Sequence, residues 1–238
     1  MGNKQVKQHF ENAKKTGVLK ISLLRLCDFP PQLRDFPNVL RTLDLSENRF
    51  VKIPEAIGNF TLLKHLNLSS NKLDELPEAI SKLTKLETLN AINNYITVVP
   101  MSYSALKNLK QVILSNNLIC EFPIMFAGLK NLDVLDLSRN KITKVPAEAK
   151  GLAVIELNLN QNQLSELAPE IAECPRLKTL RLEENCLQIQ AISPRILKES
   201  LVANLCLDGN LFSSKQLIEV EGYDVYMERY TNCRKKLE

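Results

Sequence analysis

Asparagine returns at a nearly constant interval along most of this 238-residue chain. Successive members stand 22, 23 or 25 residues apart, and each one ends the phrase Leu-x-x-Leu-x-Leu-x-x-Asn or a close variant of it. The eight members are Asn48, Asn71, Asn94, Asn117, Asn140, Asn162, Asn185 and Asn210. A fixed period of this length predicts a stack of similar structural units, because one such unit cannot bury its own apolar face.

Each phrase predicts one short strand followed by a turn. In Leu43-Asp-Leu45 the apolar side chains alternate with polar ones, so one set points inward and the other toward solvent. We expect the strands to stack in parallel and the Asn side chains to form an internal ladder that pairs backbone groups at the turns. A degenerate first copy, with Leu24 in the Asn place, brings the strands to nine and the inner face to roughly 40 Å.

Proline follows Asn at a fixed distance in five of the units. The prolines are Pro54, Pro77, Pro100, Pro123 and Pro146. Proline suits the first turn of a helix, so we expect a short helix on the convex side of each unit, with Ile57 and Ile80 facing the core. The proline is absent after Asn162 and Asn185, which predicts a less uniform convex side there. Ser193-Pro194 predicts a longer helix over residues 195–201.

These patterns predict an α/β fold, a horseshoe-shaped solenoid with a parallel concave sheet, short convex helices and a helical cap at each end. We expect the N-terminal cap at residues 1–17, the solenoid at 18–212 with one degenerate and eight full repeats, and the C-terminal cap at 213–238. The first cap reads as a helix from Asn3 to Lys15, with Val6, Phe10 and Ala13 as its apolar stripe. The second begins at a capping box, Ser213 with Gln216, and a further helix runs from residue 224 to 236. Three tyrosines in this tail, Tyr223, Tyr226 and Tyr230, either pack the cap or form a ligand surface.

Composition points to an intracellular, non-enzymatic protein. The six cysteines are scattered and no 18-residue apolar run or signal peptide occurs, so we expect a reduced, cytoplasmic chain. Basic residues exceed acidic ones by 31 − 27 = 4, too few to indicate a nucleic-acid partner. Only His9 and His65 are present, without metal-ligand or catalytic spacing, and no phosphate-binding glycine motif occurs. We therefore expect no catalysis, no cofactor and no metal, and a monomer.

The solvent-facing strand positions are the candidate binding surface. Most are short polar groups such as Ser46, punctuated by Ile92, Ile113 and Val134, and the C-terminal third carries more charge. A partner protein fits this surface better than a phosphate-rich ligand, although the face could also serve solubility alone. The predicted partner-binding residues are Asp44, Asn67, Asn90, Ile113, Asp136, Ser138, Glu156, Asn158, Arg181 and Glu183. The leading hypothesis is an intracellular adaptor or scaffold; the alternatives are a regulatory subunit of an enzyme, such as a phosphatase, and a nucleic-acid-associated protein.

The repeat motif resembles that of a known family. The 23-residue unit with Ile53-Pro54-Glu-Ala-Ile-Gly58-Asn-Phe60 is similar to intracellular leucine-rich repeat proteins of the Ras-pathway scaffold and Ras-suppressor type. The resemblance implies a signalling-related repeat protein without known catalytic residues, so there are none to transfer to this chain.

The first residues raise the question of a lipid anchor. Met1-Gly2 fits N-myristoylation, which modifies the Gly amine after Met removal, and Lys4 and Lys7 would attract anionic lipid. The motif also asks for Ser or Thr at the sixth position, where this chain has Val6. Two interpretations stay open: a membrane-associated protein with myristate on Gly2, and an unmodified capping helix that buries Val6.

Overall fold

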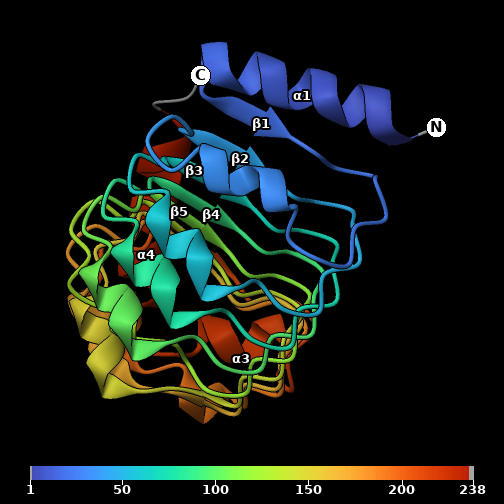
Figure 1. The fold of residues 1–238 in the computed structure, drawn as a ribbon. Helices are drawn as coiled ribbons and strands as arrows, with labels where there is room; N and C mark the ends of the chain where they lie inside the picture. Colours follow the sequence, from blue (N-terminus) through green and yellow to red (C-terminus); the bar gives the residue numbers. More distant parts are fainter. Residues whose placement is uncertain (1, 236–238) are drawn as a thin grey trace. The chain divides into compact units, whose positions relative to one another are not determined.

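The computed structural model describes the backbone of residues 2–235 and the side chains of residues 8–235. The chain has an α/β fold with a parallel sheet of nine short strands. Figure 1 labels the first five of these strands. The chain divides into two compact units, residues 1–118 (unit 1) and residues 119–238 (unit 2). The nine-stranded parallel sheet confirms the predicted fold class.

Unit 1 holds five parallel strands in chain order. Each is three residues long: β1 Val18–Lys20, β2 Thr42–Asp44, β3 His65–Asn67, β4 Thr88–Asn90 and β5 Gln111–Ile113. The pairing places Leu19 beside Leu43, and Leu43 beside Leu66, so equivalent positions of successive repeats stand side by side. This register confirms that the degenerate copy is a true repeat, because β1 pairs with β2 as the regular strands pair with one another.

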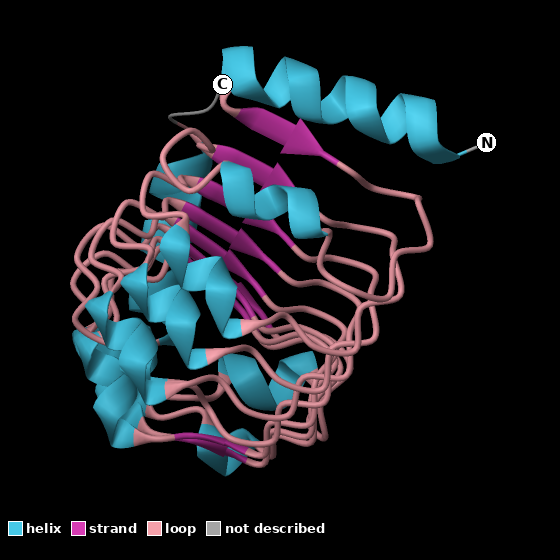
Figure 2. Ribbon diagram, viewed as in Figure 1, coloured by secondary structure: helices cyan, strands magenta, loops and turns pink. Residues whose placement is uncertain are grey.

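Short 3-10 helices lie on the other side of unit 1 from the strands, as Figure 2 shows. They are η1 Pro31–Asp35, η2 Glu55–Asn59, η3 Glu78–Lys82 and η4 Met101–Ala105. Ile57 and Ile80 are fully buried, as predicted. In η2, η3 and η4 the proline precedes the helix instead of occupying its first turn, because its extended ψ carries the chain out of the preceding loop.

A helix, α1 Gly2–Thr16, lies beside β1 in unit 1 (Figure 1). Phe10 and Ala13 are buried, and the Phe10 ring packs against Phe36 with centroids 5.5 Å apart. Gly17 ends the helix with φ of 70°, and a Cβ there would stand 2.9 Å from the carbonyl oxygen of Val39. The side chains of Gly2, Asn3 and Val6 lie outside the described residues. The predicted N-cap role of Asn3, the predicted burial of Val6 and the lipid site at Gly2 therefore lie outside them as well.

Unit 2 continues the same alternation with more varied helices. Its strands in the main sheet are β6 Val134–Asp136, β8 Glu156–Asn158, β10 Thr179–Arg181 and β11 Asn204–Cys206. A separate pair, β7 Lys144–Val145 and β9 Glu166–Leu167, forms a second small parallel sheet that the repeat pattern did not predict. The 3-10 helices are η5 Ile124–Phe126, η6 Ala147–Gly151, η7 Pro169–Glu173 and η8 Ile189–Ala191.

Three α-helices complete unit 2. The helix α2 Pro194–Lys198 starts where predicted, with Ser193 Oγ accepting from the Arg195 N–H, but ends before residue 201. The predicted capping box of Ser213 and Gln216 opens α3 Ser214–Ile218. The last helix is α4 Tyr223–Arg234. Its Tyr226 is buried and accepts a hydrogen bond from the Leu205 N–H at 3.2 Å, so this tyrosine packs the cap onto β11.

The repeated asparagines cross-link each coil to the one before it. Asn71 Nδ2 donates to the carbonyls of Leu45 and Leu68, both at 3.0 Å, and its Oδ1 accepts from the Phe50 N–H at 3.1 Å. Seven of the eight side chains are buried, whereas Asn210 is half-buried. Because each amide serves the preceding coil, Asn48 pairs the backbone around Leu24, which needs no asparagine of its own.

Candidate functional site

The sheet face of unit 1, meaning the solvent-facing side chains of β1–β5 and of the residues just after them, brings four predicted residues into one row. Asp44, Asn67, Asn90 and Ile113 are in direct register across β2, β3, β4 and β5, and all four are half-buried. Ser46 was expected to face solvent but is only 5% exposed. Its hydroxyl donates to Asp44 Oδ1 at 2.6 Å, which holds it against the sheet.

The polar members of this row have fixed orientations. Asn67 Oδ1 accepts from the Ser69 N–H and Asn90 Oδ1 accepts from the Ile92 N–H, each at 3.1 Å. These side chains therefore close the turn after their own strand, a local structural role of short polar residues. Their Nδ2 groups have no hydrogen-bond partner within the described part of the chain and remain available to a ligand.

An ion-pair bridge lies just before the strands of unit 1. Glu87 accepts from Lys64 at 2.8 Å and from Lys110 at 2.7 Å, and its side chain is 21% exposed. The hydrogen bonds from Lys110 and Lys64 lower the pKa of Glu87 to about 2. The carboxylate is therefore committed to holding three successive coils together and is not free to bind a partner.

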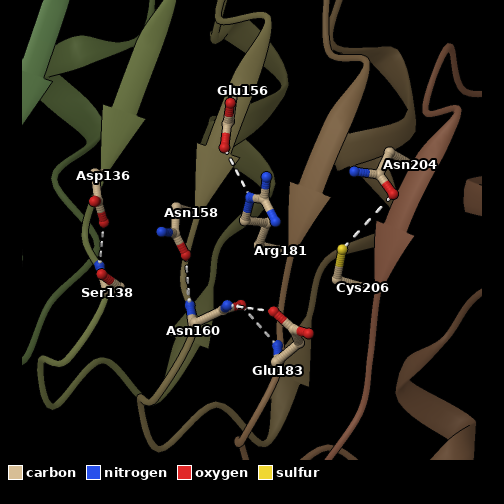
Figure 3. A network of polar contacts seen from close by, with 9 residues as sticks. All are labelled: Asp136, Ser138, Glu156, Asn158, Asn160, Arg181, Glu183, Asn204 and Cys206. Atoms are coloured by element: carbon tan, nitrogen blue, oxygen red, sulfur yellow. Dashed lines mark hydrogen bonds and ion pairs between the residues drawn. The ribbon is translucent and has the colours of Figure 1, made fainter.

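The sheet face of unit 2, defined in the same way over β6, β8, β10 and β11, carries a denser polar network (Figure 3). Asp136 Oδ1 accepts from the Ser138 N–H at 2.9 Å, and Asn158 Oδ1 accepts from the Asn160 N–H at 3.1 Å. These repeat the turn-closing geometry of unit 1. Asp136, Asn158 and Arg181 are in register across β6, β8 and β10, so three predicted residues lie side by side.

Two predicted acids of unit 2 are already engaged. Glu156 Oε1 accepts from Arg181 Nε at 2.8 Å, and this hydrogen bond raises the pKa of Arg181. Asn160, which the sequence did not single out as a binding residue, donates through Nδ2 to Glu183, whose backbone N–H donates to Asn160 Oδ1 at 2.9 Å. Figure 3 shows Glu156 with Arg181, and Asn160 with Glu183, as two separate hydrogen-bonded groups. The charge of Glu156 is therefore neutralised by Arg181, whereas Asp136 has no ion-pair partner within the described residues.

Cys206 lies on β11, the last strand of this face. It stands in register with Arg181, and its thiol lies 3.7 Å from Asn204 Oδ1. Burial, followed by the nearby Glu183 carboxylate, raises the pKa of this thiol. Cys206 is therefore held in its protonated form at neutral pH and contributes a weak donor to the face, rather than a nucleophile.

Two other kinds of site have no counterpart in the described part of the chain. No group of three or more His, Cys, Asp or Glu residues there is arranged to hold a metal ion. None of the helices in residues 2–235 is both long and apolar enough to span a membrane.

Comparison with known proteins identifies the repeat. A family model described as a leucine-rich repeat region matches residues 23–139, and a leucine rich repeat model matches residues 131–152. Among solved structures, a leucine-rich repeat protein of Leptospira interrogans is 27% identical with a TM-score of 0.76, covering 92% of this chain and 62% of its own. A plant ice-binding protein is 30% identical with a TM-score of 0.65, covering 80% and 64%.

A third structure is a complex. The Arabidopsis receptor kinase HAESA, bound to the peptide hormone IDA and the co-receptor SERK1, is 28% identical with a TM-score of 0.57. The match covers 65% of this chain and 27% of that one. This chain thus spans less than two thirds of each of these three structures.

Proposed function

We propose that this chain, which belongs to the leucine-rich repeat family, uses the sheet face of unit 2 to hold a partner protein and has no catalytic role of its own. The leucine-rich repeat fold is generally a protein–protein interaction module. The observation that carries the proposal is the polar network of Figure 3, in which the side chains are oriented by their own hydrogen bonds before any partner arrives. Such preorganisation reduces the ordering cost of binding.

The roles proposed for single residues follow from the hydrogen-bond donors and acceptors that their contacts within the chain leave unused. Asp136 keeps one carboxylate oxygen for a partner donor, and Arg181 keeps the terminal nitrogens that the Glu156 contact at Nε leaves open. Asn158 on β8 offers its amide nitrogen. Ser138 and Glu183 extend the same face on the two neighbouring coils, just after β6 and β10. In unit 1, Asp44, Asn67, Asn90 and Ile113 form a separate row that we assign as a secondary contact surface.

A charge-swap pair tests this assignment. Glu156→Arg and Arg181→Glu are expected to weaken partner capture singly, and each single change also breaks the ion pair. The double variant re-forms the pair with inverted charges, so it should recover the melting temperature of the wild type but not its partner capture. Full recovery of capture by the double variant would exclude this face as the binding surface.

Site-specific photo-crosslinking gives an independent readout. A photoreactive amino acid at Ser138 should crosslink a discrete partner in cells, whereas the same group at Gln163, which is exposed beyond the strands, should not. Equal crosslinking at both positions would indicate non-specific contact and refute the proposal.

Two alternatives have distinct signatures. If the protein is a regulatory subunit, an enzyme activity, such as that of a phosphatase, should co-purify with it from cells. A nucleic-acid-associated protein is disfavoured, because unit 2 carries 15 basic against 17 acidic residues and would repel phosphates. Filter binding with single-stranded RNA at low salt decides the second case, since salt-sensitive retention is the expected result for a true nucleic-acid binder.

The lipid anchor is proposed separately from the partner surface. Myristate on Gly2, with Lys4 and Lys7 beside it, would bring the sheet faces to an anionic membrane surface reversibly. Intact mass of the protein from eukaryotic cells tests the idea: the myristoyl mass should appear on wild type and vanish in Gly2→Ala. An unmodified or acetylated Gly2 would refute it.

A further inference from the structure

A groove of about 550 Å³ lies between the first two 3-10 helices of unit 1, on other residues than the sheet face of that unit. Its volume falls in the range typical of sites that hold a ligand group. Its floor is apolar and buried, and its rim is open to solvent. The lining includes four prolines together with Phe29, Leu33, Arg34, Ala56 and Phe60.

The groove lies where two successive 3-10 helices stay apart. η1 does not pack closely on η2, whereas η2 packs on η3, where a Cβ on Gly58 would meet the Ala79 carbonyl oxygen at 2.9 Å. The residue of η1 that is equivalent to Gly58 is Arg34.

The walls of the groove are rigid and apolar. Phe60 and Leu33 are 2% and 0% exposed and support the floor from below. The accessible apolar surface comes from the half-buried Phe29, whose ring lies 6.2 Å from that of Phe60, and from the exposed Pro54 and Ala56. Prolines supply much of the remaining wall and carry no backbone N–H. A bound apolar side chain would therefore displace water from a preformed surface at little cost in ordering.

The single charge in the lining is a cation. Arg34 is exposed and has no ion-pair or hydrogen-bond partner within residues 8–235. Unit 1 as a whole carries 16 basic against 10 acidic residues, so its field adds to that of Arg34. The groove thus combines an apolar floor with an unpaired guanidinium at its rim, which is complementary to an apolar group that has a carboxylate close by.

We propose that this groove binds a short extended peptide segment of a partner protein, with a bulky apolar side chain against Phe29, Pro54 and Ala56 and an Asp or Glu within two residues paired to Arg34. The surface is distinct from the sheet faces and would give the protein a second, independent binding site. Arg34 stands at the position of Gly58 in the next repeat and supplies the charge of the groove.

A selection experiment tests the proposal on the full chain. A displayed library of random peptides of about twelve residues is selected on wild-type protein and counter-selected on Ala56→Trp, which fills the groove from an exposed position. Selected peptides are then measured by fluorescence anisotropy against wild type, Arg34→Glu and the control Lys85→Glu. Lys85 is exposed in unit 1, outside the groove, so the control changes the net charge equally.

The expected result is a set of peptides with an apolar residue next to an acid. These should bind Arg34→Glu at least about tenfold more weakly than wild type and Lys85→Glu. Versions with Lys in place of the acid should reverse that preference. Failure to enrich any peptide over Ala56→Trp, or enriched peptides indifferent to Arg34→Glu, would overturn the proposal. If Ala56→Trp does not fold, counter-selection on Arg34→Glu separates the same two outcomes, and loss of peptide binding in the Glu156/Arg181 charge swap would place the peptides on unit 2 instead.

Discussion

Replacing Asn117 with leucine tests the internal ladder quantitatively. Asn117 is 5% exposed; its Nδ2 donates to the carbonyls of Ala91 and Leu114 at 3.0 and 2.9 Å, and its Oδ1 accepts from the Ile96 N–H at 3.1 Å. Leucine has the same number and branching of side-chain heavy atoms and is bulkier, so it leaves no cavity, and the loss of stability reflects mainly the lost hydrogen bonds. The buried Ile96 N–H left unpaired costs about 1–3 kcal/mol, and the two carbonyls add less, since each has a second lone pair. We expect a total loss of roughly 2–4 kcal/mol.

Asn210 and Asn59 make the comparison interpretable. Asn210 makes the same three kinds of bond but is half-buried, so water can replace them and we expect a loss of about 1 kcal/mol for Asn210→Leu. Asn59 is exposed in η2, and Asn59→Leu should change stability by less than about 0.5 kcal/mol. Urea unfolding followed by circular dichroism measures all three. Equal losses for Asn117 and Asn210, or a loss for Asn117 no larger than for Asn59, would refute the argument that burial of the ladder sets its contribution.

Three further predictions concern buried or bridging groups. Tyr103 is fully buried and donates to the Pro77 carbonyl at 3.0 Å, so Tyr103→Phe should cost about 1 kcal/mol and Tyr103→Ala about 3–5 kcal/mol in urea unfolding. The pKa of Glu87 is lowered to about 2 from 4.5, so its contribution is present above pH 4.5 and lost as pH falls toward 2; the melting-temperature advantage of wild type over Glu87→Gln should shrink over that window. Burial raises the pKa of Cys174 to about 11, so iodoacetamide at pH 8 should modify the exposed Cys27, Cys186 and Cys233 while leaving Cys174 intact, as peptide mass mapping will report.

The repetitive part of the fold was predictable because the same local pattern occurs many times. Leu43 and its equivalents alternate with polar residues in most repeats, so an ambiguous residue in one copy is resolved by comparison with the others. Even the first strand could be found, since Leu19 and Ile21 keep the phase of Leu43 and Leu45 although Leu24 replaces the asparagine. The capping box at Ser213 could be predicted for a different reason. Its two hydrogen bonds join residues that are only three apart in the sequence, so the local pattern is enough.

Side-chain contacts between coils were harder to foresee. Glu156 and Arg181 are 25 residues apart, and the approach of Glu156 Oε1 to Arg181 Nε depends on the register of two coils as well as on their rotamers. The same holds for Asn160 with Glu183. The sequence therefore indicated a more charged face in the C-terminal third, but it did not show that Glu156 and Arg181 pair there. Ser46 was misassigned because strand alternation predicts direction, whereas its burial depends on the neighbouring Asp44.

The groove of unit 1 shows how a departure from a repeat can be more informative than the repeat itself. Once Pro30 and Phe36 are aligned with Pro54 and Phe60, Arg34 falls on Gly58. In η2 a Cβ at that position would approach the next coil to 2.9 Å. In η1 the same position carries a large exposed cation, and η1 does not pack closely on η2, so the groove lies between them. In a solenoid each coil contacts only its neighbours, and such a local exception can therefore create a binding surface without disturbing the stack.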